Sequence, residues 1–135
     1  MATGLDPIPG SVDCVRRLAA AYPLAVCSGA LHGEIEPTLQ CMGLTEAFRA
    51  IVSADDVAHS KPDPASYRLA VARLSEALGT ELVPADCVAI EDTPTGVASA
   101  RNAGLRVIGL GLSGPGPEGA HRVVGSLDEV TAEAL

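Results

Sequence analysis

The chain has 135 residues, of which 47% are hydrophobic and only 2% aromatic, and its formal net charge is −8. This length fits one domain over residues 1–135, with a core of Ala, Val, Leu and Ile that suits packed helix and strand layers. The acidic balance argues against nucleic acid or an anionic membrane as a partner, whereas a small anionic substrate is compatible with it, because one lysine and a bound cation can reverse the local charge.

Helices alternate with short strands in the predicted order of elements. Apolar runs of about four residues between turn residues are typical of buried strands, and caps, prolines and glycines mark the helix limits. This pattern implies a mostly parallel α/β sheet with its working residues at the carboxyl ends of the strands. The expected helices are 11–22, 30–42, 64–78, 93–103 and one from 126, the strands are 24–27, 50–53, 87–90, 106–110 and 123–124, and the main loops are 55–64 and 111–119.

The cysteines and the first residues bear on the compartment. Cys14, Cys27, Cys41 and Cys87 are widely spaced and form no C-x-x-C pair, so we expect reduced core residues and not metal ligands. Met1 is followed by a polar stretch rich in turn residues, and no apolar run approaches the ~20 residues that span a bilayer. The sequence therefore predicts a cytoplasmic protein.

Ser28 and Lys61 are the first candidate site residues. Ser28 follows an apolar strand and precedes a helix, so its hydroxyl and the first helical amides could converge on a phosphate, although Ser is equally an ordinary N-cap. Lys61 stands before Pro62, which favours an extended backbone that projects the lysine into a site. The alternative for Lys61 is a solvated side chain paired with Asp63.

Glu91 and Asp92 form a pair of adjacent carboxylates at the exit of a later strand. Carboxylate oxygens suit Mg²⁺, whereas the structural alternative is a turn cap at Asp92 and a solvated Glu91. His32, His59 and His121 receive no role, because no second ligand follows at a spacing typical of a metal site.

Taken in order, these positions resemble the last three motifs of the haloacid dehalogenase superfamily. The resemblance covers nearly the whole chain and is strongest to the phosphoglycolate phosphatase and β-phosphoglucomutase-like group. The matching stretches are Pro7-Ile8-Pro9-Gly10, Cys27-Ser28-Gly29, Lys61-Pro62-Asp63-Pro64 and Ile90-Glu91-Asp92-Thr93. The fold that this implies is a three-layer α/β/α, Rossmann-like parallel sheet.

The resemblance also implies roles for these residues. Ser28 and Gly29 would bind the transferring phosphoryl group, and Lys61 would neutralise charge on that group and on the nucleophile. Glu91 and Asp92 would hold Mg²⁺, the implied cofactor. Such roles are mainly electrostatic, as phosphoryl transfer requires.

The first motif of the family is missing. It is a strand ending in Asp-x-Asp, and this chain contains no Asp-x-Asp; Asp6 and Asp13 fit a turn or a helix start, so no nucleophile is assigned. The helical cap that selects substrate is absent too. In the family the first-motif strand lies between those that end at Ser28 and Glu91, so its loss would leave unpaired edges. The two strands could close up against one another, or another chain or segment could fill the gap between them. We hypothesise instead that this chain is part of a longer natural protein. The upstream coding sequence tests this hypothesis.

The sequence thus predicts a partial haloacid dehalogenase-like domain of the Mg²⁺-dependent phosphatase type, acting on small phosphorylated metabolites but inactive as this chain. The alternative is a non-catalytic module that binds phosphate or Mg²⁺, or that pairs through exposed strand edges, for example as a homodimer. A nucleotide-binding doubly wound domain is less favoured because no G-x-G-x-x-G follows a predicted strand.

Overall fold

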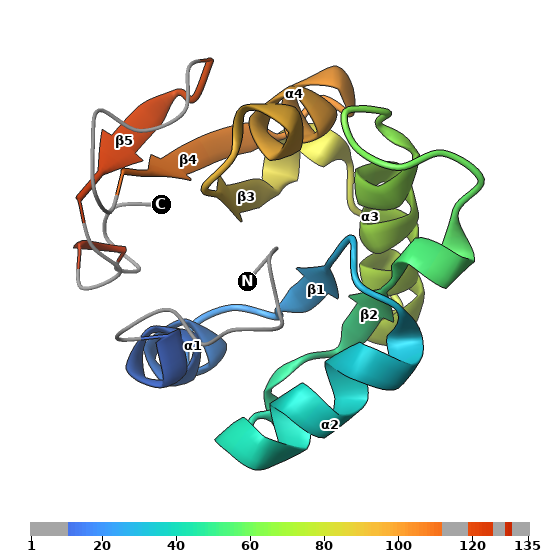
Figure 1. Cartoon of the computed structure of the whole chain (residues 1–135), viewed down its shortest axis with the longest axis vertical. Helices are drawn as coiled ribbons and strands as arrows, with labels where there is room; N and C mark the ends of the chain where they lie inside the picture. The colour runs from blue at the N-terminus through green and yellow to red at the C-terminus, as the bar shows by residue number, and fades with distance from the viewer. Residues whose placement is uncertain (1–10, 112–118, 126–128, 131–135) are drawn as a thin grey trace.

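The computed structural model describes residues 11–111, 119–125 and 129–130 (Figure 1). The helices and strands alternate as expected. In chain order they are α1 (Ser11–Ala19), β1 (Ala25–Cys27), α2 (His32–Met42), β2 (Ala50–Val52), α3 (Ala65–Leu78), β3 (Val88–Glu91), α4 (Pro94–Asn102), β4 (Arg106–Leu110) and β5 (Arg122–Val124). Short 3-10 turns precede β2, follow β2 and precede β3. The loop predicted over 111–119 and the last helix predicted from 126 fall largely outside the described residues.

The helix limits follow from the local signals in the sequence. Gly43 and Gly79 end α2 and α3 in the left-handed conformation, with φ of 69° and 65°. Thr93 caps α4 by accepting a hydrogen bond from the Gly96 N–H. Helix α3 begins one residue later than predicted, at Ala65, and the Asp63 carboxylate accepts the Ala65 N–H at 2.8 Å. Asp63 therefore still satisfies a backbone donor at the start of this helix.

The strands form two parallel sheets. β1 pairs with β2, and β3, β4 and β5 form the second sheet in that order. Within the described residues β1 pairs only with β2 and β3 only with β4, so the strands ending near Ser28 and at Glu91 have not closed up against one another. One edge of β1 and one edge of β3 thus have no partner strand in the described part of the chain, as expected from the missing first-motif strand.

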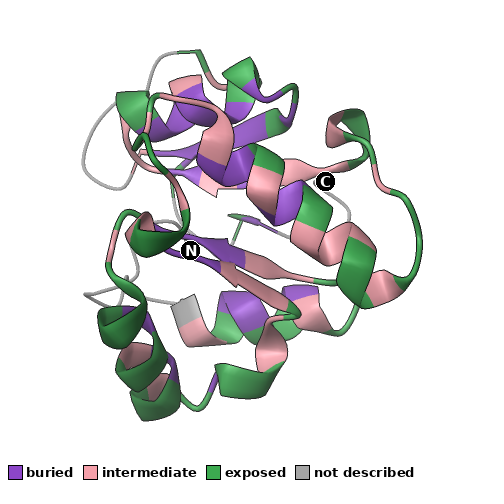
Figure 2. Cartoon of the chain, turned by 90° about the vertical axis from the view of Figure 1, so that its right-hand side faces the viewer, coloured by how far each residue is buried: buried purple, intermediate pink, exposed green. Residues whose placement is uncertain are grey.

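Helices cover both faces of these sheets, which confirms a three-layer α/β arrangement (Figure 1). Helices α3 and α4 pack on one face, and α1 and α2 lie on the other. Buried residues lie along the strands and the inner sides of the helices, while the outer helix surfaces are exposed (Figure 2). The α3 and α4 side of the core includes Cys27, Val52, Tyr67, Ala70, Val71, Ala89, Val97, Ala100 and Val107. The opposite side includes Cys14, Val15, Leu18, Val26, Ile35, Leu39, Ile108, Leu110 and Val124.

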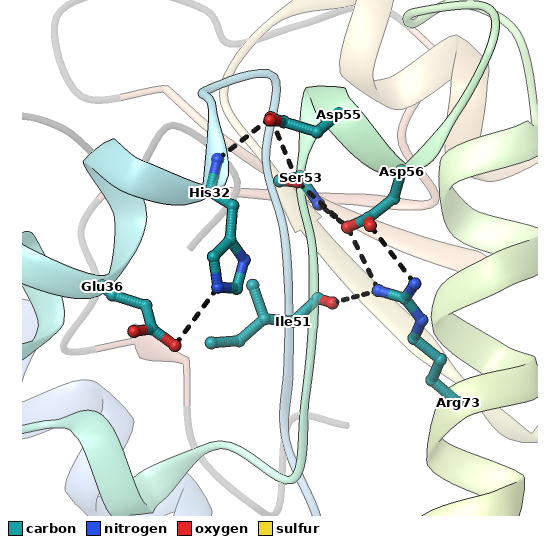
Figure 3. Close-up of polar contacts among 7 residues, drawn as sticks. All are labelled: His32, Glu36, Ile51, Ser53, Asp55, Asp56 and Arg73. Carbon is teal, nitrogen blue, oxygen red and sulfur yellow. Dashed lines mark hydrogen bonds and ion pairs between the residues drawn. The ribbon is translucent and has the colours of Figure 1, made fainter.

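Polar contacts fasten α3 and α2 to the segment that follows β2 (Figure 3). The Arg73 guanidinium on α3 donates to the Ile51 carbonyl at 2.6 Å and to the Asp56 carboxylate at 3.1 Å. The Asp55 carboxylate accepts the N–H of His32 at the start of α2, at 3.1 Å. These contacts fix the position of the loop that leads towards Lys61.

The prediction that all four cysteines are core residues is wrong for Cys41. Cys14 and Cys27 are buried and Cys87 is intermediate, whereas Cys41 is exposed. Ile35 and Leu39 mark the inner face of α2, and Cys41 lies two residues further on, about 200° around the helix. None of these four cysteines forms a disulfide.

Candidate functional site

Ser28 lies directly after β1 in a buried position. Its residue is 3% exposed, its N–H donates to Val52 O at 2.9 Å, and its Oγ accepts the Ala30 N–H at 3.1 Å. The hydroxyl thus orders the turn that leads into α2, but Ser28 is not the N-cap of this helix, which is Leu31. Because a hydroxyl both accepts and donates, this contact leaves its proton for another acceptor. Gly29 is exposed, and a Cβ there would meet no atom within 4 Å.

Lys61 reaches from its loop to the ends of two strands. Its Nζ donates to the Cys27 carbonyl at 3.0 Å and to Glu91 Oε2 at 2.6 Å. These contacts replace the alternative pairing with Asp63. The carboxyl ends of β1 and β3 therefore meet at the same edge, as expected for parallel strands. An ammonium has three donors, so one N–H remains for an anion.

Glu91 occupies a closed position at the end of β3. The residue is 2% exposed, and Oε2 accepts from both Lys61 Nζ and the Tyr67 hydroxyl. The pKa of Tyr67 is well above its usual value, first because the phenol is buried and then because the Glu91 charge opposes its ionisation. Glu91 is therefore a buried carboxylate with an ammonium and a phenol as partners, and not the solvated residue of the structural alternative.

Asp92 presents the oxygen best suited to a cation. Its Oδ1 is buried and has no hydrogen-bond partner within the described part of the chain. A buried oxygen in this state is costly unless an ion, water or ligand completes it, so Asp92 fits one position in the shell of a hard cation such as Mg²⁺. Among the described residues, however, no group of three or more His, Cys, Asp or Glu side chains could hold a metal. The chain supplies part of a donor set.

The structure thus brings together Ser28, Lys61 and the Glu91-Asp92 pair, while their functional roles stay predictions. His32 instead pairs with Glu36 at 3.3 Å on the exposed surface of α2 (Figure 3). Two residues that lie against Glu91 were not predicted. Tyr67 donates its hydroxyl to the Glu91 carboxylate but reads as a core residue in a helical pattern. Gly96 faces the same carboxylate but reads as an ordinary residue of α4.

An apolar cavity of about 130 Å³ lies beside the unpaired strand edges. It is lined from both sheets, by Ala25 and Cys27 of β1 and by Val88, Ala89 and Ile90 of β3, and also by residues of α1 and α3. The residues that would be covered by an intervening strand therefore face a partly open space.

No helix among the described residues is long and apolar enough to cross a bilayer.

Comparison with known proteins decides the family. Residues 1–104 match the family model of the haloacid dehalogenase-like hydrolases. The chain belongs to this family. It is 33% identical over 108 residues to the fructose-1-phosphate phosphatase YqaB of Escherichia coli and 35% identical over 97 residues to the β-phosphoglucomutase of Bacillus subtilis. The matches cover 80% and 72% of this chain.

Solved structures of the family share its fold. CbbY from Rhodobacter sphaeroides in complex with phosphate superposes with a TM-score of 0.75 at 33% identity, covering 90% of this chain and 54% of that one. The match to the E. coli phosphatase likewise covers 54% of that relative, and the match to the B. subtilis mutase covers 40%. The haloacid dehalogenase-like chain therefore spans about half the length of the curated relatives it matches.

Proposed function

We propose that this chain carries the phosphate-binding and cation-binding part of a phosphatase-type site for small phosphorylated metabolites. The observation that carries the proposal is the meeting of Lys61 with the ends of β1 and β3, next to Ser28 and Asp92. Support comes from relatives named as sugar-phosphate phosphatases and mutases and from the phosphate complex of CbbY. We also propose a cytoplasmic location, in line with the metabolite substrates in these names.

The proposed phosphate site combines three kinds of donor. The Ser28 hydroxyl and the backbone around Gly29 would donate to phosphoryl oxygens, and the remaining Lys61 N–H would add a charged hydrogen bond. The Lys61 charge would matter most for a phosphoryl group, because negative charge develops on its oxygens during transfer. Glu91 keeps the ammonium at the site while burial keeps water away from the pair.

Mg²⁺ is the proposed cofactor, held by Asp92 with Glu91 at its side. Bound there, the ion would supply charge neutralisation for the phosphoryl oxygens. Asp92 has the unpartnered oxygen for this contact, whereas Oε2 of Glu91 is already shared between Lys61 and Tyr67. A full octahedral shell would need oxygens from outside this pair.

We propose further that catalysis by this chain alone is negligible, because no Asp-x-Asp supplies the nucleophile. The test is p-nitrophenyl phosphate hydrolysis with Mg²⁺, using the purified chain and the Lys61→Ala and Asp92→Ala variants. The expected result is the same background rate for all three. Turnover by the unmodified chain that both substitutions abolish would show that another residue serves as nucleophile.

A second candidate function is strand-edge pairing with another copy of the chain. The observation that favours it is the single-sided pairing of β1 and β3 in the described residues, beside an apolar cavity. Exposed edges carry unpaired N–H and C=O groups, which a strand from a second molecule can satisfy. Sedimentation velocity over a wide concentration range tests it: a reversible dimer is expected, and a well-folded monomer at high concentration would contradict strand-mediated assembly.

A further inference from the structure

The Glu91 carboxylate lies in a buried socket formed by Gly96 and Tyr67. The space on the Gly96 side exists only because this residue has no side chain. A Cβ built on Gly96 would lie 2.0 Å from Oε1 of Glu91 and 2.3 Å from its carboxyl carbon, far inside contact distance. Gly96 is a helical residue of α4, with no positive φ to explain a glycine. Its missing side chain therefore has a packing reason, since the first turn of α4 closes over the buried carboxylate.

Tyr67 completes the socket from the other side. Its residue is 5% exposed, its hydroxyl donates to Oε2 of Glu91, and its ring lies 5.0 Å from Lys61 Nζ. One carboxylate oxygen thus accepts from two donors on different elements, the loop before α3 and α3 itself. A buried carboxylate needs hydrogen-bond partners. The Tyr67 phenol is a rigid partner packed in the core, whereas the Lys61 side chain is long and flexible.

We propose that Tyr67 is a positioning residue: its hydroxyl fixes the Glu91 carboxylate, and through it the Lys61 ammonium, at the carboxyl ends of β1 and β3. The functional importance of a fixed ammonium rests on the proposed phosphate site. The positioning of Lys61 by Tyr67 and Glu91 does not depend on that proposal. The ring packs in the core with or without its hydroxyl, so core packing alone leaves the oxygen unexplained. The geometry assigns that oxygen to Glu91.

The chain allows a clean test, because Lys61 is its only lysine and Tyr22 its only other tyrosine. Tyr67→Phe removes the hydroxyl and keeps the ring beside the ammonium. Tyr22→Phe is the matched control, at a residue 40% exposed. The readout is the rate of reductive methylation of Lys61 by formaldehyde and borohydride, separated from the N-terminal amine by peptide mass mapping, with thermal unfolding and circular dichroism as checks of the fold.

Lys61 is expected to react about tenfold faster in Tyr67→Phe than in the unmodified chain and in Tyr22→Phe. Without the Tyr67 hydroxyl the Glu91 carboxylate can turn away, and the Lys61 ammonium then loses its charged hydrogen-bond partner. An unchanged rate in folded Tyr67→Phe would overturn the proposal. If that variant does not fold, proton NMR of the unmodified chain decides: a slowly exchanging Tyr67 hydroxyl signal is expected, and its absence would count against the proposal.

Binding of inorganic phosphate to the same proteins, measured by calorimetry, separates the two proposals. Faster Lys61 modification in Tyr67→Phe without phosphate binding by the unmodified chain would leave the positioning role standing and refute the phosphate site. Phosphate binding by the unmodified chain, with an unchanged Lys61 modification rate in Tyr67→Phe, would support the phosphate site and refute the positioning role of Tyr67. Weaker phosphate binding by Tyr67→Phe together with faster modification supports both.

Discussion

Lys61 Nζ lies 2.6 Å from Glu91 Oε2, and these two residues, 30 positions apart, join the loop before α3 to the end of β3. Their side chains are 14% and 1% exposed, so most of the pair is removed from water. Desolvating two charges is costly, and a buried pair persists where further hydrogen bonds complete it. Cys27 O and Tyr67 provide those bonds here.

Replacing Lys61 with Met should destabilise the fold by about 3 kcal/mol, because it leaves the Glu91 charge buried without a cation. Urea denaturation of the chain measures the change. Arg68→Met, at an exposed position of α3, is the control and should cost less than about 0.5 kcal/mol. The double variant Lys61→Met/Glu91→Gln should recover part of the loss; a double variant less stable than Lys61→Met would contradict this interpretation.

Gly96→Ala should also destabilise the chain, by about 2 kcal/mol or more, because the new methyl group overlaps the Glu91 carboxylate. A loss of stability would be informative, because replacing glycine with alanine inside a helix normally stabilises it by about 1 kcal/mol. Gly33→Ala in α2 is a matched control: a Cβ there meets nothing within 4 Å, and a small gain is expected. Denaturation midpoints that rise for both variants would show that Glu91 is not enclosed by Gly96.

The free energy of unfolding should decrease at acidic pH because the Asp56 carboxylate becomes protonated. The hydrogen bond from Arg73 is the first cause that lowers the pKa of Asp56 from 3.8 to about 2, with the Ser53 N–H adding to it. A carboxyl whose pKa is lower in the folded state stabilises the fold above its unfolded pKa, and this contribution disappears as pH falls from about 4 to about 2. The side chains of Arg73 and Asp56 are 37% and 25% exposed, so solvent screening limits this contribution to about 1 kcal/mol or less.

Denaturant midpoints measured between pH 2 and pH 6 test this expectation with Asp56→Asn. The difference between the two proteins should be present at pH 6 and vanish near pH 2. Glu76→Gln, an exposed carboxyl group on the same helix as Arg73, serves as the control. A constant difference over the whole range would mean that the Asp56 charge has no part in stability.

The cysteines should differ in reactivity towards an aromatic disulfide reagent. Cys41 is exposed and should react first, whereas Cys14 and Cys27 are buried and should react only on unfolding. Burial raises the pKa of Cys27, and burial followed by the Asp86 charge raises the pKa of Cys87, so less thiolate is present at neutral pH. Cys41→Ser should remove the fast phase; a fast phase that persists in this variant would contradict the placement of Cys41.

Much of the fold could be predicted because local signals and burial agree. The runs ending at Cys27 and Ile90 are wholly apolar, which is typical of buried strands, and parallel strands then bring Ser28 and Glu91 to one edge. The pairing of Lys61 with Glu91 was not predicted, because the sequence pointed only to a phosphoryl group or Asp63 as the partner of this lysine. Cys41 was assigned to the core from its residue type alone, although its spacing from Ile35 and Leu39 places it on a different face of α2.

The socket around Glu91 could not be predicted in this way. An aromatic residue at helical spacing, such as Tyr67, is read as core, and its hydroxyl partner lies 24 residues later. Gly96 shows no turn or positive φ, so its role depends on a distance between α4 and β3 that only the tertiary structure gives. The division into two sheets also depends on which strand edges pair in the tertiary structure, and the sequence of each strand does not specify this.

Titration of the ¹⁵N-labelled chain with inorganic phosphate, in the presence of Mg²⁺, tests the central claim most directly. The amides of Ser28, Gly29 and Ala30 and the ammonium of Lys61 should shift together and saturate, and Lys61→Ala should weaken binding at least tenfold, as the loss of a charged hydrogen bond predicts. Shifts that are absent from these groups, or that are equally strong in Lys61→Ala, would contradict a phosphate site at the ends of β1 and β3.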